Sequence, residues 1–220
     1  MRPGPSPSLN PRKSPRQGRS IATVKAIFEA TLQVLRADGP ARLNTTRVAR
    51  RAGVSVGTLY QYFPNKQALL FAALERHLAM LADAIEQACD ENRHVPLEAM
   101  AAAVVRAYVQ TRMVQAEVTP ALYLVTRELD VRPLAELAAQ RSERAIEAML
   151  VTANEGHLTH PHVIAQTLTA AIYGTVPAFC PRVLSLANSR EAERQLTVMF
   201  HSYLLAQQSG TAETKSAHVR

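Results

Sequence analysis

The chain has 220 residues, of which 47% are hydrophobic and only 5% aromatic, and it carries a formal net charge of +7. This length allows one or two compact units with an ample apolar core. Two cysteines, Cys89 and Cys180, are too few for a disulfide framework. No apolar run approaches the roughly 18 residues of a membrane-spanning helix, and no secretory signal follows the basic N-terminus. We therefore expect a soluble cytoplasmic protein.

The positive charge is concentrated at the N-terminal end. Residues 1–20 carry five basic and no acidic side chains, and residues 21–66 carry seven basic and two acidic ones. Residues 67–220 carry thirteen basic and sixteen acidic side chains. This division is typical of a nucleic-acid-binding head on a nearly neutral body. It disfavours a membrane-surface role, which would place the charge on an amphipathic face.

The chain is expected to begin with a disordered basic arm over residues 1–19, which are rich in Pro, Ser, Gly and Arg. The arm could contact a minor groove or phosphates, or it could be a solvated leader without specific contacts. A first helix is predicted from Ser20, because apolar residues follow at helical spacing from Ile21 to Leu35. The Asp-Gly-Pro sequence at 38–40 ends this helix.

The segment 44–63, NTTRVARRAGVSVGTLYQYF, predicts two short helices joined by a tight turn. Asn44 and Ser55 can each cap a helix, and Gly53 tolerates the positive φ that follows a helix C-terminus. Apolar residues flank each cap at hydrophobic-staple spacing, namely Leu43 with Val48 and Val54 with Leu59. A helical hairpin inside an ordinary bundle is the alternative, but the caps, staples and basic surroundings favour a DNA-reading helix-turn-helix.

The second short helix presents small, hydroxylated, amidic or aromatic side chains and no acid, which suits an approach to DNA. Gly57 leaves room for close contact, and Gln61 could pair with adenine. After Pro64, a cap by Asn65 begins a further helix, whose positive end and the Lys66 ammonium predict a phosphate site. We expect contacts to phosphates by Ser55, Thr58, Tyr60, Tyr62 and Lys66, to base edges by Val56, Gly57 and Gln61, and to the flanking backbone by Thr45, Thr46 and Arg47.

The stretch A-G-V-S-x-G-T-L-Y-x-Y-F-P-x-K-x-x-L, from Ala52 to Leu69, resembles the N-terminal domain of TetR-type transcriptional regulators. The resemblance extends over about residues 20–78, and the rest of the chain matches the family only in length and helical content. It implies an all-α protein in which a three-helix DNA-binding domain precedes a helical effector-binding and dimerisation domain. The expected domains are residues 20–66, which contain the helix-turn-helix at 44–63, residues 67–207, and a disordered tail at 208–220.

The body of the chain predicts helices throughout and shows no strand pattern. A helix over 66–90 connects head and body, and further helices are expected over about 97–116, 120–130, 133–154, 161–175 and 188–207. In the resembled family the last two long helices of each subunit form a four-helix bundle between subunits. Ala170, Ala171 and Gly174 would allow the close approach that such a dimer needs. The alternative is that both helices are buried inside a monomer.

The resembled family holds a small molecule between its body helices. Candidate effector-binding residues here are Met100, Tyr108, Tyr123 and Arg127, with Arg106 and Arg112 as further cations for an anionic effector. An ordinary role in the core or on the solvated surface is the competing interpretation for each. The histidines His157, His160 and His162 lack a recognisable zinc-ligand pattern, so we expect no metal and no cofactor.

Two classes of function are weighed. The first is a ligand-responsive, sequence-specific DNA-binding regulator, a repressor that binds an inverted-repeat operator as a homodimer, because helix-turn-helix half-sites are read in pairs. The second is an effector-independent architectural DNA-binding or protein-interaction module. No enzyme is expected, since the sequence lacks a nucleophile elbow, a phosphate-binding glycine loop, an HExxH motif and paired cysteines.

Overall fold

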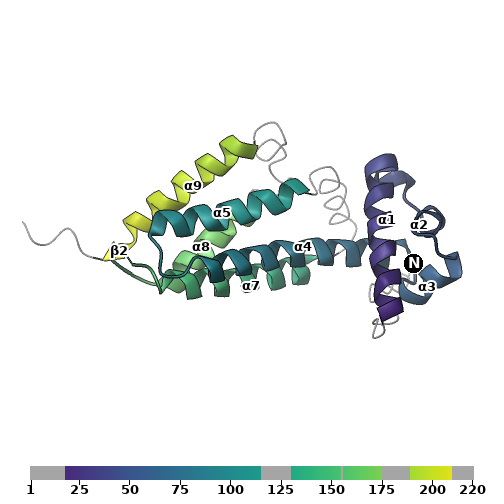
Figure 1. Cartoon of the computed structure of the whole chain (residues 1–220), viewed down its shortest axis with the longest axis horizontal. Coiled ribbons are helices and arrows are strands. Elements are labelled where there is room, and N and C mark those ends of the chain that lie inside the picture. Colours follow the sequence, from purple (N-terminus) through teal and green to yellow (C-terminus); the bar gives the residue numbers. More distant parts are fainter. Residues whose placement is uncertain (1–17, 115–129, 155, 175–188, 210–220) are drawn as a thin grey trace, which may run out of the picture. The chain divides into compact units, whose positions relative to one another are not determined.

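The computed structural model describes residues 18–114, 130–154, 156–174 and 189–209. Residue contacts divide the chain into an N-terminal unit, residues 1–78 with 115–134, and a C-terminal unit, residues 79–114 with 135–220. Figure 1 shows that helices make up most of the described parts of both units. The boundary at residue 78 falls inside α4 (Lys66–Glu91), so this helix belongs to both units.

The N-terminal unit is built on α1 (Gly18–Arg42), against which α2 (Thr45–Ala52) packs. The next helix, α3 (Val56–Tyr62), packs on α2, and Figure 1 shows α2 and α3 on the same side of α1. Gly39 interrupts the helical backbone of α1 with a φ of 73°, close to the expected helix end. The core of α1 begins deeper in the helix than expected, because Ile21 is exposed whereas Ile27 is fully buried.

The caps predicted for the helix-turn-helix are confirmed. Gly53 adopts the left-handed conformation, with a φ of 68°, and its amide donates to the carbonyls at the end of α2. Each capping side-chain oxygen accepts a hydrogen bond from the backbone N–H three residues later. These bonds are Arg47 N to Asn44 Oδ1 at 2.9 Å, Thr58 N to Ser55 Oγ at 2.9 Å, and Ala68 N to Asn65 Oδ1 at 2.7 Å.

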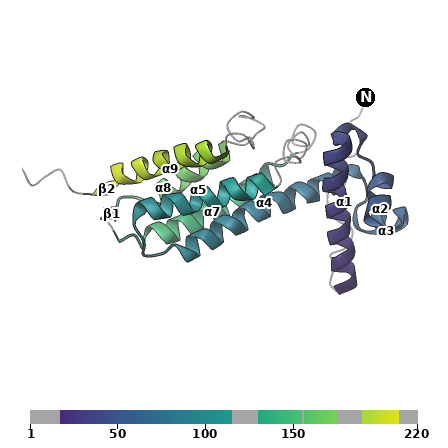
Figure 2. The same cartoon turned by 45° about the horizontal axis from the view of Figure 1, so that its top comes forward.

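The C-terminal unit combines the second part of α4 and most of α7 (Arg132–Leu150) with α5 (Leu97–Val114), α8 (Pro161–Gly174) and α9 (Ser189–Ala206). Figures 1 and 2 show α9 beside α5 and α7 beside α4. Arg141 on α7 joins the last pair by hydrogen-bonded ion pairs to Asp83 and Glu86 on α4. These carboxylates raise the pKa of the Arg141 guanidinium.

Two details of the C-terminal unit correct the expectations from sequence. Helix α7 ends at Leu150 and does not continue to Asn154. The Thr152 hydroxyl donates to the Met149 carbonyl at 2.7 Å, and such side-chain bonds compete with the helical ladder. A short antiparallel pair, β1 (His157–Leu158) with β2 (Gln208–Ser209), occurs where no strand was expected. It places residues 208–209 in structure although the tail was expected to be disordered from residue 208.

Several expectations lie outside the described residues. They concern the basic arm up to residue 17, nearly all of the helix expected over 120–130, Cys180, and the tail from residue 210. Within the described ranges, none of the helices combines the length and apolar character needed to cross a membrane.

Cys89, near the end of α4, is a buried free thiol whose pKa is raised to about 12, chiefly by burial. Burial therefore keeps the Cys89 thiol protonated at pH 8, and the protonated thiol is not the reactive form. In a Cys180→Ser variant, iodoacetamide should therefore modify Cys89 at least a hundredfold more slowly in the native protein than in guanidinium chloride. Mass spectrometry of timed samples measures both rates, and equal rates would show that Cys89 is accessible in the native state.

Candidate nucleic-acid interface

Helix α3 is anchored on one side and open on the other. Leu59 and Phe63 are buried, and the Phe63 ring packs edge-on against Phe28 of α1 with ring centroids 5.5 Å apart. Four residues at positions i, i+1, i+4 and i+5 share the adjoining, open face of the helix. We call this surface, formed by Val56, Gly57, Tyr60 and Gln61, the reading face. Val56 is half-buried and the other three residues are exposed.

Tyr60 is the large side chain of the reading face, with 41% of its surface exposed. Its hydroxyl lies 3.1 Å from the Thr45 hydroxyl, in the first turn of α2. Thr45 itself is buried, so its place is beneath Tyr60 and not at the surface where a direct backbone contact was expected. The hydroxyl pair restrains the Tyr60 phenol and links α2 to α3. Thr46, the next residue, is exposed.

The packing of the N-terminal unit does not explain why position 57, on the reading face, is a glycine. A Cβ atom added there would meet only the Ser55 Oγ atom at 3.7 Å, which is an ordinary van der Waals contact. Glycine in a helix costs about 0.5–1 kcal/mol relative to alanine. The domain therefore carries a destabilising residue without an internal steric reason. A close approach by an outside surface is a reason that fits its exposed position.

Arg47 is held by α1 more firmly than sequence reasoning expected. Its Nη1 atom lies 2.7 Å from the Asp38 Oδ2 atom, so this guanidinium is engaged in an ion pair inside the N-terminal unit. Thr58 and Tyr62 are also half-buried, whereas Ser55 is exposed. The Ser55 hydroxyl accepts the capping bond from Thr58 and lies 2.8 Å from the Thr58 hydroxyl, so both side chains support the start of α3.

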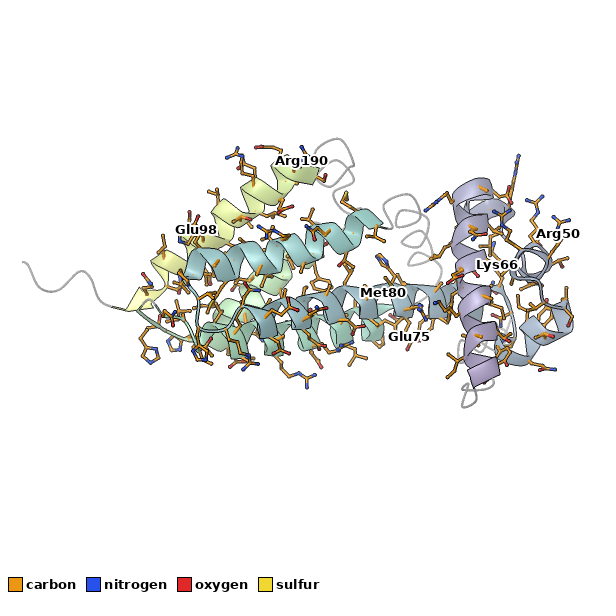
Figure 3. All side chains as sticks on the ribbon, viewed as in Figure 1. Arg50, Lys66, Glu75, Met80, Glu98 and Arg190 are labelled. Atoms are coloured by element: carbon orange, nitrogen blue, oxygen red, sulfur yellow. The ribbon has the colours of Figure 1, made fainter. Side chains whose placement is uncertain are left out.

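The N-terminus of α4 forms a second part of the candidate surface. Asn65 caps this 26-residue helix, and Lys66 stands in its first turn, half-buried, where Figure 3 labels it. The first turn of a long helix presents backbone N–H groups and the positive end of the helix dipole. Lys66 adds a full positive charge at this point. The combination is suited to one phosphate group.

A long stretch of the N-terminal unit carries charges of positive sign alone. From residue 39 to residue 74 the sequence has no acidic side chain, whereas it has five basic ones. This acid-free stretch includes all of α2, all of α3 and the start of α4. An anionic polymer meets no like charge from this stretch and gains from several cations.

A separate polar cluster lies inside the C-terminal unit. Tyr108 on α5 is fully buried, and its ring centroid is 6.0 Å from that of Tyr173 on α8. The Tyr173 hydroxyl is 3.1 Å from the Ser142 hydroxyl of α7. Arg112 is only 1% exposed and its guanidinium carbon lies 5.5 Å from the Tyr108 ring centre, within the range of a cation–π contact. Thr169, also buried, stands one turn before Tyr173 on α8.

The candidate effector residues have different outcomes. The structure brings Tyr108 into this polar cluster, and Met100 is buried on the same helix. Tyr123 and Arg127 lie outside the described residues. Sequence reasoning did not identify Ser142 and Thr169, because single hydroxyl residues on amphipathic helices carry no distinctive pattern.

The histidine-rich segment near residue 160 shows ordinary polar contacts. The His162 Nδ1 atom lies 3.0 Å from the Glu147 Oε2 atom. Across the described ranges, no group of three or more His, Cys, Asp or Glu side chains is placed to hold a metal ion.

Part of the N-terminal unit is similar to known proteins. The sequence profile described as "Bacterial regulatory proteins, tetR family" matches residues 27–73. We call the matched residues 27–73 the TetR-family domain. The same part is similar to the HTH-type transcriptional repressor KstR of Mycolicibacterium smegmatis, with 48% identity over 52 residues, or 24% of this chain and 26% of KstR. It also resembles the HTH-type regulator BetI 1 of Chromohalobacter salexigens, with 35% identity over 71 residues, or 32% and 35% of the two chains.

The chain thus matches only about a quarter to a third of the length of these curated relatives, and the match covers the TetR-family domain. Solved structures extend the likeness to the whole fold. A TetR-family transcriptional regulator from Streptomyces coelicolor is 21% identical with a TM-score of 0.62, covering 83% of this chain and 82% of that one. The TetR-family repressor AlkX from Dietzia sp. strain DQ12-45-1b is 18% identical with a TM-score of 0.57, covering 85% and 98%. These likenesses confirm the predicted all-α fold.

Proposed function

We propose that this protein is a ligand-responsive transcriptional repressor that binds an inverted-repeat operator in double-stranded DNA as a homodimer. The observation that carries the proposal is the exposed reading face of α3, capped and anchored on a TetR-family domain that has no acid between residues 39 and 74. Regulators named as transcriptional repressors share this part of the sequence. A repressor of this kind acts on chromosomal DNA, so the proposal includes a cytoplasmic location and no catalytic activity.

The residues have distinct roles in this proposal. Val56, Gly57 and Gln61 approach base edges in the major groove, and Gln61 offers the amide that pairs with adenine. Tyr60, restrained by Thr45, and Lys66 at the start of α4 bind phosphates and so fix the register of the helix on the duplex. Ser55 and Thr58 shape the start of α3, and Thr46 and Tyr62 are additional backbone contacts. Arg47 contributes to DNA binding through the surface that it shares with Asp38.

The dimer proposal rests on apolar surface that the C-terminal unit does not bury. On α8, Val163 is 54% exposed and lies in one stripe with Thr167, Ala170 and Gly174, opposite the buried face of the helix. On α9, Val198 is 51% exposed, and Met199 and Leu205 are exposed to a similar degree. Small residues on α8 permit close helix approach, and the larger ones on α9 supply apolar area. We call the exposed stripes of α8 and α9 the dimer face.

The effector proposal rests on the polar cluster of the C-terminal unit. A guanidinium, one phenol and two hydroxyls are buried here, with the half-buried Tyr173 phenol beside them, and interiors usually avoid such groups because their burial is costly. Such a set of groups is typical of small-molecule sites, where a few polar groups stand in an apolar surround. We propose that an aromatic or anionic effector binds beside Tyr108, Arg112 and Tyr173. An effector-independent architectural role is the alternative, and this cluster argues against it.

DNA binding through this surface has a measurable salt signature. Fluorescence anisotropy of a labelled operator duplex with the full-length protein should give a linear fall of log affinity with log salt, with a slope near −0.9 per phosphate contact. Lys66→Ala should reduce the slope by about one, since it removes one phosphate contact. Tyr60→Ala should weaken binding about tenfold or more, because it removes the phenol and its bond to Thr45.

Arg190→Ala is the matched control for these variants. Arg190 lies on α9 in the C-terminal unit, is exposed, and is labelled in Figure 3. This variant removes the same charge as Lys66→Ala but should leave slope and affinity unchanged. A salt-independent affinity, or equal losses in Lys66→Ala and Arg190→Ala, would contradict the proposed interface.

A further inference from the structure

A groove of about 350 Å³ lies between α1 and α2 in the TetR-family domain. Gln33, Val34, Ala37 and Asp38 line it from α1, and Arg47, Arg50 and Arg51 line it from α2. None of these residues belongs to the reading face of α3. Three guanidinium groups and one carboxylate give the groove a formal charge of +2.

Two of the three arginines are held in place from the α1 side. Arg47 Nη1 lies 2.7 Å from Asp38 Oδ2, and Arg51 Nε donates to Gln33 Oε1 at 2.6 Å. Each guanidinium has five N–H donors, and each of these bonds uses one of them. These two bonds therefore orient the guanidinium groups of Arg47 and Arg51, and the remaining N–H donors of both groups can bind more oxygen atoms. Arg50 stands beside them on α2, exposed, where Figure 3 labels it.

We propose that this groove binds a phosphate group. Pre-oriented guanidinium forks match the oxygen atoms of phosphate, and charge-assisted bonds of this type are the strong ones. The volume lies at the lower end of the range for small-molecule sites. Asp38 weakens anion binding by the groove, since its carboxylate repels an anion and also accepts a hydrogen bond from Arg47. The phosphate is supplied either by the DNA backbone outside the half-site or by a free phosphate compound.

The first test is calorimetric titration of sodium pyrophosphate into the full-length protein at low ionic strength. Arg50→Ala/Arg51→Ala should weaken binding at least tenfold, whereas Asp38→Asn should strengthen it several-fold by removing the repulsion. The matched control is Arg144→Ala/Arg190→Ala, which removes the same charge from two exposed positions of the C-terminal unit and should change binding less than twofold. Both groove arginines also stabilise the last turn of α2 through the helix dipole, so thermal melting of each variant must show a folded protein.

The second test separates the two sources of phosphate. Affinity is compared for an operator duplex that ends at the half-sites and for one extended by about one helical turn on each side. If the DNA backbone supplies the phosphate, the double groove variant should lose at least tenfold in affinity for the extended duplex only. If a free compound supplies it, this variant should bind both duplexes like the unmodified protein and lose pyrophosphate binding alone.

The inference is overturned if the double groove variant matches its control both in pyrophosphate binding and in affinity for the extended duplex. Pyrophosphate titration needs no operator and no effector, so it can succeed even if the proposed regulatory function fails. Conversely, if the groove binds no phosphate, operator binding through the reading face is unaffected.

Discussion

Replacing Gly57 with alanine should stabilise the protein and weaken its binding to DNA. Alanine is favoured over glycine in helices by up to about 1 kcal/mol, and the added methyl group meets only the Ser55 hydroxyl at an ordinary distance. On the reading face, the same methyl group would stand between α3 and the base edges. Overpacking a tight contact costs about 1–3 kcal/mol, which corresponds to a loss of roughly five- to 150-fold in operator affinity.

Gly53→Ala is the matched control, four residues earlier. Gly53 has a φ of 68°, and no atom lies within 4 Å of its added Cβ. Alanine there should destabilise the fold by about 1–2 kcal/mol because the left-handed conformation disfavours a side chain. The folded fraction should still bind the operator normally. Thermal melts and anisotropy titrations of both variants measure the two effects, and an unchanged affinity of Gly57→Ala would show that α3 does not approach DNA closely at this point.

The double substitution Val163→Glu/Val198→Glu should convert the protein to a monomer and reduce operator affinity at least a hundredfold. Both valines are about half exposed on the dimer face, so glutamates there leave the folded subunit intact but place like charges in a buried apolar contact. A monomer reads one half-site and loses the gain in effective concentration that a linked second reader supplies. Analytical ultracentrifugation gives the oligomeric state, and anisotropy gives the affinity.

Val151→Glu provides the control for this prediction. Val151 is 64% exposed just after α7 and outside the dimer face, so its charge should alter neither assembly nor DNA binding. If the double variant stays dimeric, the dimer face is placed wrongly. If it becomes monomeric and still binds the full operator with unchanged affinity, DNA reading does not depend on pairing.

The sequence predicted the local features of the TetR-family domain well, because short-range chemistry determines them. Asn44, Ser55 and Asn65 each accept the backbone bond expected of a cap, and Gly53 adopts the expected left-handed conformation. In each case the deciding atoms lie within three or four residues of one another. The bounds of α4 and α5 were predicted nearly correctly for the same reason.

Features that depend on distant residues could not be predicted. The ion pair between Asp38 and Arg47 depends on how α2 crosses α1, which no local pattern specifies. The contact between the Thr45 and Tyr60 hydroxyls similarly depends on the angle between α2 and α3. Sequence reasoning therefore missed both contacts, and binding of the DNA backbone by Thr45 and Arg47 stays a prediction.

The most direct test of the central claim is selection of DNA by the full-length protein from a randomised duplex library, followed by sequencing. If α3 of two paired subunits reads DNA, the selected sequences should contain an inverted repeat whose half-sites are separated by about one helical turn, roughly 34 Å, or a multiple of it. The same selection with Gly57→Ala should enrich that repeat poorly. Tight, salt-sensitive binding without any enriched sequence would contradict the account, because it would show a protein that holds the DNA backbone but does not read bases.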